Sequence, residues 1–125
     1  MAWIEVEGRG VLLVRQAAGQ QFWTLPGGKV RLRESLHKAL EREIREETNL
    51  EVRPERWIQL MDRPERGALM VLFSVVIAKW RPWPKLPTRE ISEIRFASEL
   101  PKNASPSAKY FWKLIHHNSS RVGAL

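Results

Sequence analysis

The sequence contains no cysteine, and this excludes several classes of protein. Without thiols the chain has no disulfide framework, no thiolate-bound zinc and no catalytic cysteine. Such a composition suits a reducing compartment, and we expect a cytoplasmic protein. The chain has 125 residues, of which 43% are hydrophobic, enough for one core without covalent or metal staples. We therefore expect one domain over residues 1–125, in which any metal serves chemistry rather than folding.

Segments that would enter or cross a membrane are also lacking. Residues 1–7 alternate in polarity and have no basic block followed by an apolar block, as a signal peptide would. The longest apolar stretches, residues 68–73 and 75–78, are far shorter than the roughly 20 residues that span a bilayer. We expect a soluble protein that does not use a membrane as a partner.

Positive charge is in excess, with 21 Lys and Arg residues against 14 Asp and Glu residues and a formal net charge of +7. Such a charge speeds encounters with polyanions, which include small nucleotides and RNA. It also keeps a protein soluble without any binding role. Charge alone does not choose between these alternatives.

Short alternating and apolar stretches, separated by turn residues, predict a mixed α/β fold. The expected strands are a hairpin from residues 3–7 and 11–14, a strand at 22–25, a long hairpin from 52–61 and 68–80, and a strand at 90–96. Three prolines in residues 81–87 indicate a loop there. Residues 107–117 predict a closing helix, with Tyr110, Leu114 and Phe111 facing inward.

The clearest helix begins near Ser35, a suitable N-cap, and ends near Asn49, which tolerates the left-handed conformation that closes helices. Leu36, Leu40 and Ile44 recur at four-residue spacing. At about 100° per residue they form one apolar stripe, which we expect to face the core.

Three carboxylates crowd the edge of that stripe. Glu43 and Glu47 project at nearly the same azimuth as the apolar residues, and Glu46 lies on the flank. Like charges this close need a compensating cation, and oxygen donors without His or Cys favour Mg²⁺, or Mn²⁺, over zinc. The alternative is a solvated helix face on which the glutamates pair with Arg42 and Arg45.

A longer pattern favours the metal site. The segment from Gly28 to Leu50 has glycine, five residues, glutamate, seven residues, and then Arg-Glu-Ile-Arg-Glu-Glu-Thr-Asn-Leu. This resembles the Nudix box. The positions that match are Gly28, Glu34, Arg42, Glu43, Ile44, Glu46, Glu47 and Leu50. The one departure is Asn49 in place of glycine, for which we expect a small stability cost and no loss of chemistry, because Asn tolerates the same backbone conformation.

The resemblance implies an α/β/α sandwich around a mixed β-sheet. It also implies that Glu43, Glu46 and Glu47 ligate the divalent ions, with the backbone carbonyl of Gly27 as a fourth oxygen donor. Within the box, Gly28, Glu34 and Arg42 would have structural roles.

The family often adds a carboxylate from outside the box, as a further ligand or general base, and Glu90 fits best, with Glu93 in reserve. The resemblance thus implies catalytic roles for Glu46, Glu47 and Glu90. Each of the two outer glutamates could equally be a solvated residue in a turn.

The implied reaction is metal-assisted hydrolysis of a pyrophosphate bond in a nucleotide, with a nucleoside triphosphate as the first choice of substrate. The alternatives are ADP-ribose, dinucleoside polyphosphates, the 5′ end of RNA, or nucleotide sensing without catalysis. Arg15, Lys29 and Arg31 are candidates for clamping phosphates, and Trp83 for stacking on a base, against the alternative that they only cover the surface or pack. The oligomeric state, monomer or homodimer, stays open.

Overall fold

The computed structural model describes the backbone of residues 1–124 and the side chains of residues 1–117. It contains the strands β1 (Ala2–Trp3), β2 (Glu5–Val6), β3 (Gly10–Gln16), β4 (Trp23–Thr24), β5 (Glu51–Arg63), β6 (Ala68–Lys79) and β7 (Ile91–Ala97). The helices are α1 (Leu36–Thr48), the short 3₁₀ turn η1 (Pro64–Arg66) and α2 (Pro106–Ala124). Neither long helix, within the described residues, is apolar enough to cross a lipid bilayer.

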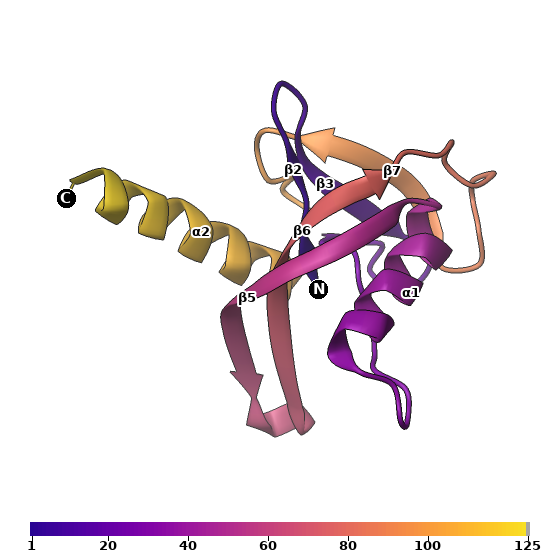
Figure 1. The fold of residues 1–125 in the computed structure, drawn as a ribbon, viewed down its shortest axis with the longest axis horizontal. Helices are drawn as coiled ribbons and strands as arrows, with labels where there is room; N and C mark the ends of the chain where they lie inside the picture. The colour runs from indigo at the N-terminus through magenta and orange to yellow at the C-terminus, as the bar shows by residue number, and fades with distance from the viewer. Residues whose placement is uncertain (125) are drawn as a thin grey trace.

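The strands form two sheets (Figure 1). The first is mixed and has the order β1-β6-β5, with β1 parallel to β6 and β5 antiparallel to it. In the second, β3 pairs antiparallel with β2, β4 and β7. Pro54 lies within the edge strand β5, at a shift in register, where a residue without an N–H is tolerated. The long β5–β6 hairpin ends in η1, and Gly67 closes that turn at φ +60°.

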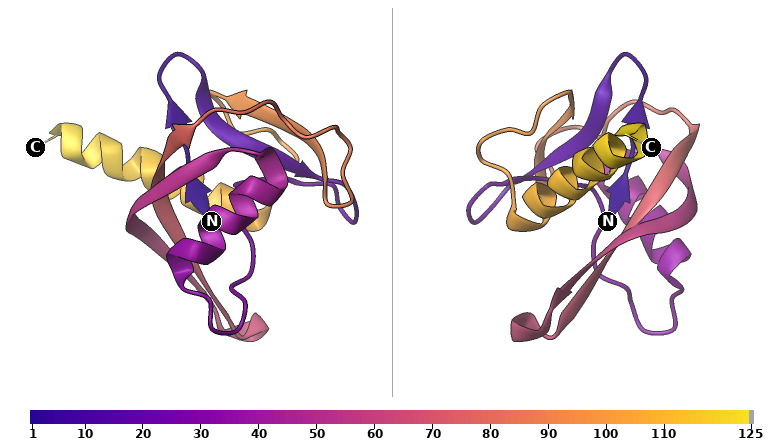
Figure 2. Two further views of the ribbon diagram at one scale, coloured as in Figure 1. Left: turned by 45° about the vertical axis from the view of Figure 1, so that its right-hand side comes forward. Right: turned by 90° about the vertical axis from the view of Figure 1, so that its left-hand side faces the viewer.

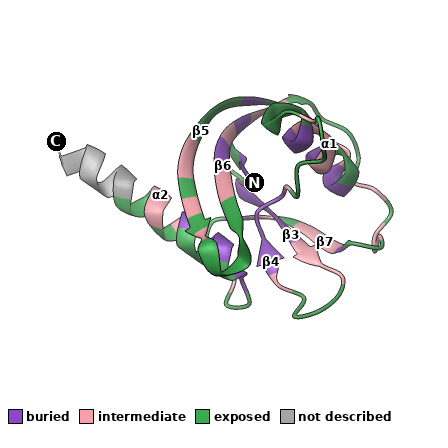
Figure 3. Ribbon diagram, turned by 90° about the horizontal axis from the view of Figure 1, so that it is seen from below, coloured by how far each residue is buried: buried purple, intermediate pink, exposed green. Residues whose placement is uncertain are grey.

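The two long helices cover opposite faces of these sheets (Figure 2). Successive residues of β3 show why, since side chains along a strand alternate between faces. Leu12 joins a core with α1 residues, whereas Leu13 joins a core that contains Phe111 of α2. Both cores are continuous with buried residues of β6 (Figure 3). The predicted α/β/α sandwich is therefore confirmed.

Three local predictions were wrong. Residues 3–7 do not form one strand, because the chain leaves the first sheet after β1 and enters the second at β2, with Ile4 buried between them. Tyr110 is 40% exposed, and its neighbour Phe111 fills the core instead. Leu36 is 49% exposed because the buried residues of α1 begin only at Ala39, so the first turn lies outside the contact with the sheets.

Candidate active site

Helix α1 begins and ends at the residues that the sequence predicts. The Ser35 hydroxyl accepts a hydrogen bond from the backbone N–H of Lys38 at 3.1 Å. At the other end Asn49 adopts φ +66°, and its N–H donates to the carbonyl of Arg45 at 2.9 Å. These caps fix the length of the helix that carries the glutamates.

Arg42 ties the loop before the helix to the helix itself. Its Nε and Nη2 donate to the two carboxylate oxygens of Glu34, at 2.7 and 2.9 Å. Nη2 also donates to the carbonyl of Lys29 at 3.0 Å, and Glu34 accepts the N–H of Arg31 at 3.0 Å. These hydrogen bonds, that of Arg42 above all, lower the pKa of Glu34 to about 2. The positioning role that the resemblance implies for this pair agrees with these contacts.

The same guanidinium holds two of the predicted metal ligands. Its Nη1 lies 2.8 Å from a carboxylate oxygen of Glu43 and 3.4 Å from one of Glu46. Gly28 lies against Glu43 so closely that a Cβ there would be 2.6 Å from the carboxyl carbon. Glycine is therefore required at this position for Glu43 to lie where it does.

Glu47 is the buried carboxylate of the site, with only 8% of its surface exposed. It accepts the N–H of Gly27 at 2.8 Å. Burial raises the pKa of Glu47 to about 8, and the nearby charges of Glu43 and Glu90 add to the effect. Gly27 has φ +123°, and a Cβ on it would lie 2.8 Å from Cα of Met1, so the turn that meets Glu47 also needs glycine.

Glu47 lines a cleft of about 530 Å³, which lies between the box loop (residues 27–34), the β5–β6 hairpin and the start of α2. Gly27 and Glu90 line the same cleft. An adjoining depression of about 220 Å³ is lined by Glu46, Glu47 and Glu90 together. Glu93 instead pairs with Arg15 at 3.0 Å. Of the two outer carboxylates, only Glu90 lies beside the box glutamates.

The donors suit a hard divalent ion, since all are oxygens and one is a buried carboxylate with a raised pKa. Among the described residues, however, no three acidic or histidine side chains converge closely enough to hold an ion. Of the two carboxylates that Nη1 of Arg42 contacts, Glu46 is the more distant, and its side chain is about half-exposed. Glu43 and Glu46 are both paired with Arg42, so these side chains would have to move toward Glu47 for the three to hold one ion. The oxygen donors themselves are of the kind that a hard divalent ion takes.

The four predicted substrate contacts lie in different places. Arg31 is next to the carboxylates, with Nη2 at 3.8 Å from Glu46. Lys29 is exposed on the box loop. Arg15 is occupied by its ion pair with Glu93, described above, and by a hydrogen bond to the carbonyl of Gln21. Trp83 lines a separate pocket at the far end of α1.

Several residues that line the cleft had not been expected from the sequence. Arg63 and Arg66, at the end of the β5–β6 hairpin, add positive charge to the lining of the cleft, and Arg63 is already paired with Glu65. A chain of hydroxyls at the start of α2 lines it as well, with Ser105 donating to Thr24 at 2.9 Å and lying 3.2 Å from Ser107. The basic turn is visible in the sequence, but no local pattern shows that it reaches this cleft.

A family model described as NUDIX domain matches residues 1–113. Among solved structures, a UDP-X diphosphatase aligns over 94% of this chain and 61% of its own, with 23% identity and a TM-score of 0.71. A MutT NUDIX hydrolase from Burkholderia pseudomallei aligns over 87% and 89%, with 25% identity and a TM-score of 0.61. An ADP-ribose pyrophosphatase from Streptococcus suis aligns over 86% and 81%, with 23% identity and a TM-score of 0.69. No curated protein matches the chain.

Proposed function

This chain belongs to the Nudix family, and from that premise we propose that it hydrolyses a pyrophosphate bond in a nucleoside triphosphate, with Mg²⁺ or Mn²⁺ as cofactor. The observation that carries the proposal is the cleft that Glu47 and Glu90 line together with Arg63 and Arg66. Carboxylates and guanidiniums in one cleft suit a substrate whose phosphates bridge between metal ions and arginines.

Each part of the cleft has a role in this proposal. Bound divalent ions would neutralise the phosphate oxygens and lower the pKa of the attacking water. Glu43, Glu46 and Glu47, with the Gly27 carbonyl, would hold those ions. Glu90, which lines the depression, would take the proton of the water.

Nucleoside diphosphate derivatives are the second candidate class. Two of the similar structures are described as acting on UDP-X and on ADP-ribose. The cleft of about 530 Å³ has room for a nucleotide, and its lining includes Phe22, Gln16 and Ser105, which could contact the group beyond the phosphates. The charge of +7 keeps RNA 5′ ends as a further alternative.

The test is turnover of a substrate panel with Mg²⁺ or Mn²⁺. The panel contains nucleoside triphosphates, ADP-ribose, dinucleoside polyphosphates and triphosphorylated RNA. We expect the triphosphates to be preferred, and Glu46→Gln to abolish the activity. Glu41→Gln, the same change on the same helix, is the matched control and keeps it. Tight nucleotide binding with no turnover of any substrate would instead identify a sensing module.

A second comparison tests the general base. We expect Glu90→Gln to lower kcat by about 10²–10⁴-fold, the usual contribution of proton transfer. Glu93→Gln, which removes the charge that pairs with Arg15 and Arg95, should leave kcat within about twofold. Equal losses in the two variants would show that Glu90 has no special place in the reaction.

A further inference from the structure

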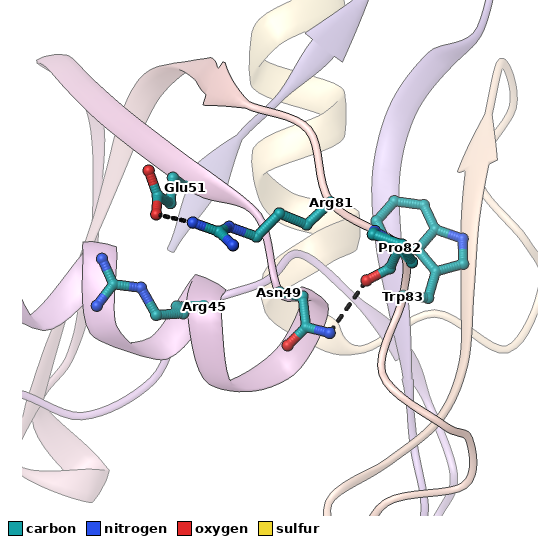
Figure 4. A pocket seen from close by; sticks show the side chains of 6 residues that line it. All are labelled: Arg45, Asn49, Glu51, Arg81, Pro82 and Trp83. Atoms are coloured by element: carbon teal, nitrogen blue, oxygen red, sulfur yellow. Dashed lines mark hydrogen bonds and ion pairs between the residues drawn. The ribbon is translucent and has the colours of Figure 1, made fainter.

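A second pocket, of about 640 Å³, lies at the C-terminal end of α1 (Figure 4). Its walls are Arg45, Asn49, Glu51, Arg81, Pro82 and Trp83. It shares no lining residue with the catalytic cleft or with the depression beside it. The proposed reaction therefore gives this pocket no role.

We propose that this pocket is a second binding site for a phosphorylated nucleoside, either a free nucleotide or one unit of a single strand. The phosphate lies against Arg45 and Arg81, and the base lies against Trp83. This proposal does not depend on which substrate the catalytic cleft takes.

The basic end of the pocket carries more positive than negative charge. Arg81 pairs with Glu51, Nη2 to Oε1, at 2.6 Å. Arg45 is exposed, and within the described residues its guanidinium has neither a hydrogen bond nor an ion pair. The pKa of Glu51 is lowered by the hydrogen bond and charge of Arg81, and then by the charges of Lys79 and Arg45. Three cations thus surround one carboxylate, and the excess suits a phosphate.

The aromatic end of the lining is Trp83, which lies beyond Pro82 from the guanidiniums of Arg45 and Arg81 (Figure 4). Trp83 belongs to the proline-rich loop and packs on Phe96, with ring centroids 6.3 Å apart. The Asn49 side-chain amide donates to the carbonyl of Pro82 at 3.0 Å, which fixes this loop to the end of α1. Asn49 stands where the Nudix box has glycine, and a glycine would have no side chain to make this bond. The departure from the box is thus part of the pocket.

A pocket lined by both guanidiniums and an indole suits a nucleotide better than a simple anion. A pocket of this volume accepts a drug-sized ligand, and an indole offers a stacking surface to any base. The aromatic surface also continues beyond the pocket, where Arg9 lies over exposed Trp80 with its guanidinium carbon 5.2 Å from the ring centroid. A strand longer than one nucleotide would find further contacts there.

The experiment measures binding in EDTA, so that turnover does not interfere. The probes are AMP and a short 5′-phosphorylated oligoadenylate, titrated into the intact protein by calorimetry. We expect Arg45→Gln and Trp83→Leu each to weaken binding about tenfold, since a charge-assisted hydrogen bond and a stacked base each contribute on that scale. Arg56→Gln is the matched control, because Arg56 is also exposed and unpaired within the described residues but lies outside this pocket.

The outcomes separate the sources of the ligand and the two sites. If the variants weaken the binding of both probes, the pocket is a nucleotide site. If they weaken the binding of the oligoadenylate alone, it is a site for single strands. Arg66→Gln, in the catalytic cleft, should leave this component of binding unchanged. The proposal is overturned if Arg45→Gln and Trp83→Leu bind both probes as Arg56→Gln does, or if neither probe binds the unaltered protein at millimolar concentration.

Discussion

Asn49 does two separate things at the end of α1, and two substitutions tell them apart. Its backbone holds φ +66°, and its side chain donates to the carbonyl of Pro82. Asn49→Ala loses the hydrogen bond and also places an ordinary side chain in the left-handed region. Asn49→Gly loses the hydrogen bond but relieves the backbone, at the expense of a more flexible unfolded chain.

The magnitudes follow from these terms. A left-handed conformation costs an alanine about 1–2 kcal/mol, and the exposed hydrogen bond contributes about 0.5–1 kcal/mol. We therefore expect Asn49→Ala to lower the free energy of unfolding by about 2 kcal/mol. For Asn49→Gly the lost bond and the added chain entropy are partly offset by the relaxed backbone, and a destabilisation of about 0.5–1 kcal/mol remains. The hydrogen bond to Pro82 thus reverses the small stability cost that the sequence alone suggests for asparagine at this position.

Urea denaturation followed by circular dichroism measures both values, and the linear extrapolation should show unchanged slopes. For a chain of this length the difference between the variants corresponds to roughly 4 °C in Tm. Equal destabilisation by alanine and glycine would refute the argument from backbone conformation. A glycine variant as stable as the unaltered protein would show that the relaxed backbone offsets the bond to Pro82 completely, contrary to the expected destabilisation.

Three further predictions concern the box and the core. Gly28→Ala places a Cβ 2.6 Å from the carboxyl carbon of Glu43, which is the far end of a flexible side chain, so we expect this carboxylate to be displaced and turnover to fall, with a loss of only about 0.5 kcal/mol in urea denaturation; unchanged turnover would contradict the argument. The pKa of Glu34 is lowered, so its pair with Arg42 stabilises the fold fully above pH 4.5 and less as the pH falls toward 2. Glu34→Gln should remove this part of the pH dependence of unfolding, and a parallel curve would count against it. Phe111→Ala should cost about 3–5 kcal/mol by calorimetry, because the ring is fully buried between α2 and the sheets, and a loss under 1 kcal/mol would show that α2 is not part of the core.

The sequence predicts best those features that depend on residues close to one another along the chain. Helix α1 has its caps, its stripe and its glutamates within one continuous segment, so its limits at Ser35 and Asn49 follow from local rules. The long hairpin was also predicted, because β-branched residues flank a turn with Pro64 and Gly67. The loop before α1 and its ion pair with Arg42 were expected from the fixed spacing of residue types in the Nudix box.

The predictions were wrong where contacts with a segment distant in the sequence determine the structure. The alternation of residues 3–7 is real, but the chain changes sheet at Ile4, because β6 pairs with Ala2 and Trp3 whereas β3 pairs with Glu5 and Val6. Arg15 has the charge to bind phosphate, yet Glu93, which is 78 residues away, takes its guanidinium. Arg66 reaches the cleft only because the hairpin bends toward it, and no local pattern encodes that path.

The contacts of Arg42 have a consequence that appears when its donors are counted. A guanidinium has five N–H bonds, and here Nε serves Glu34, Nη2 serves Glu34 and Lys29, and Nη1 serves Glu43 and Glu46. None is left over. A lysine would keep the positive charge but would offer three donors from a single atom, which cannot reach a loop carbonyl and three carboxylates at once. This position therefore selects a shape as well as a charge.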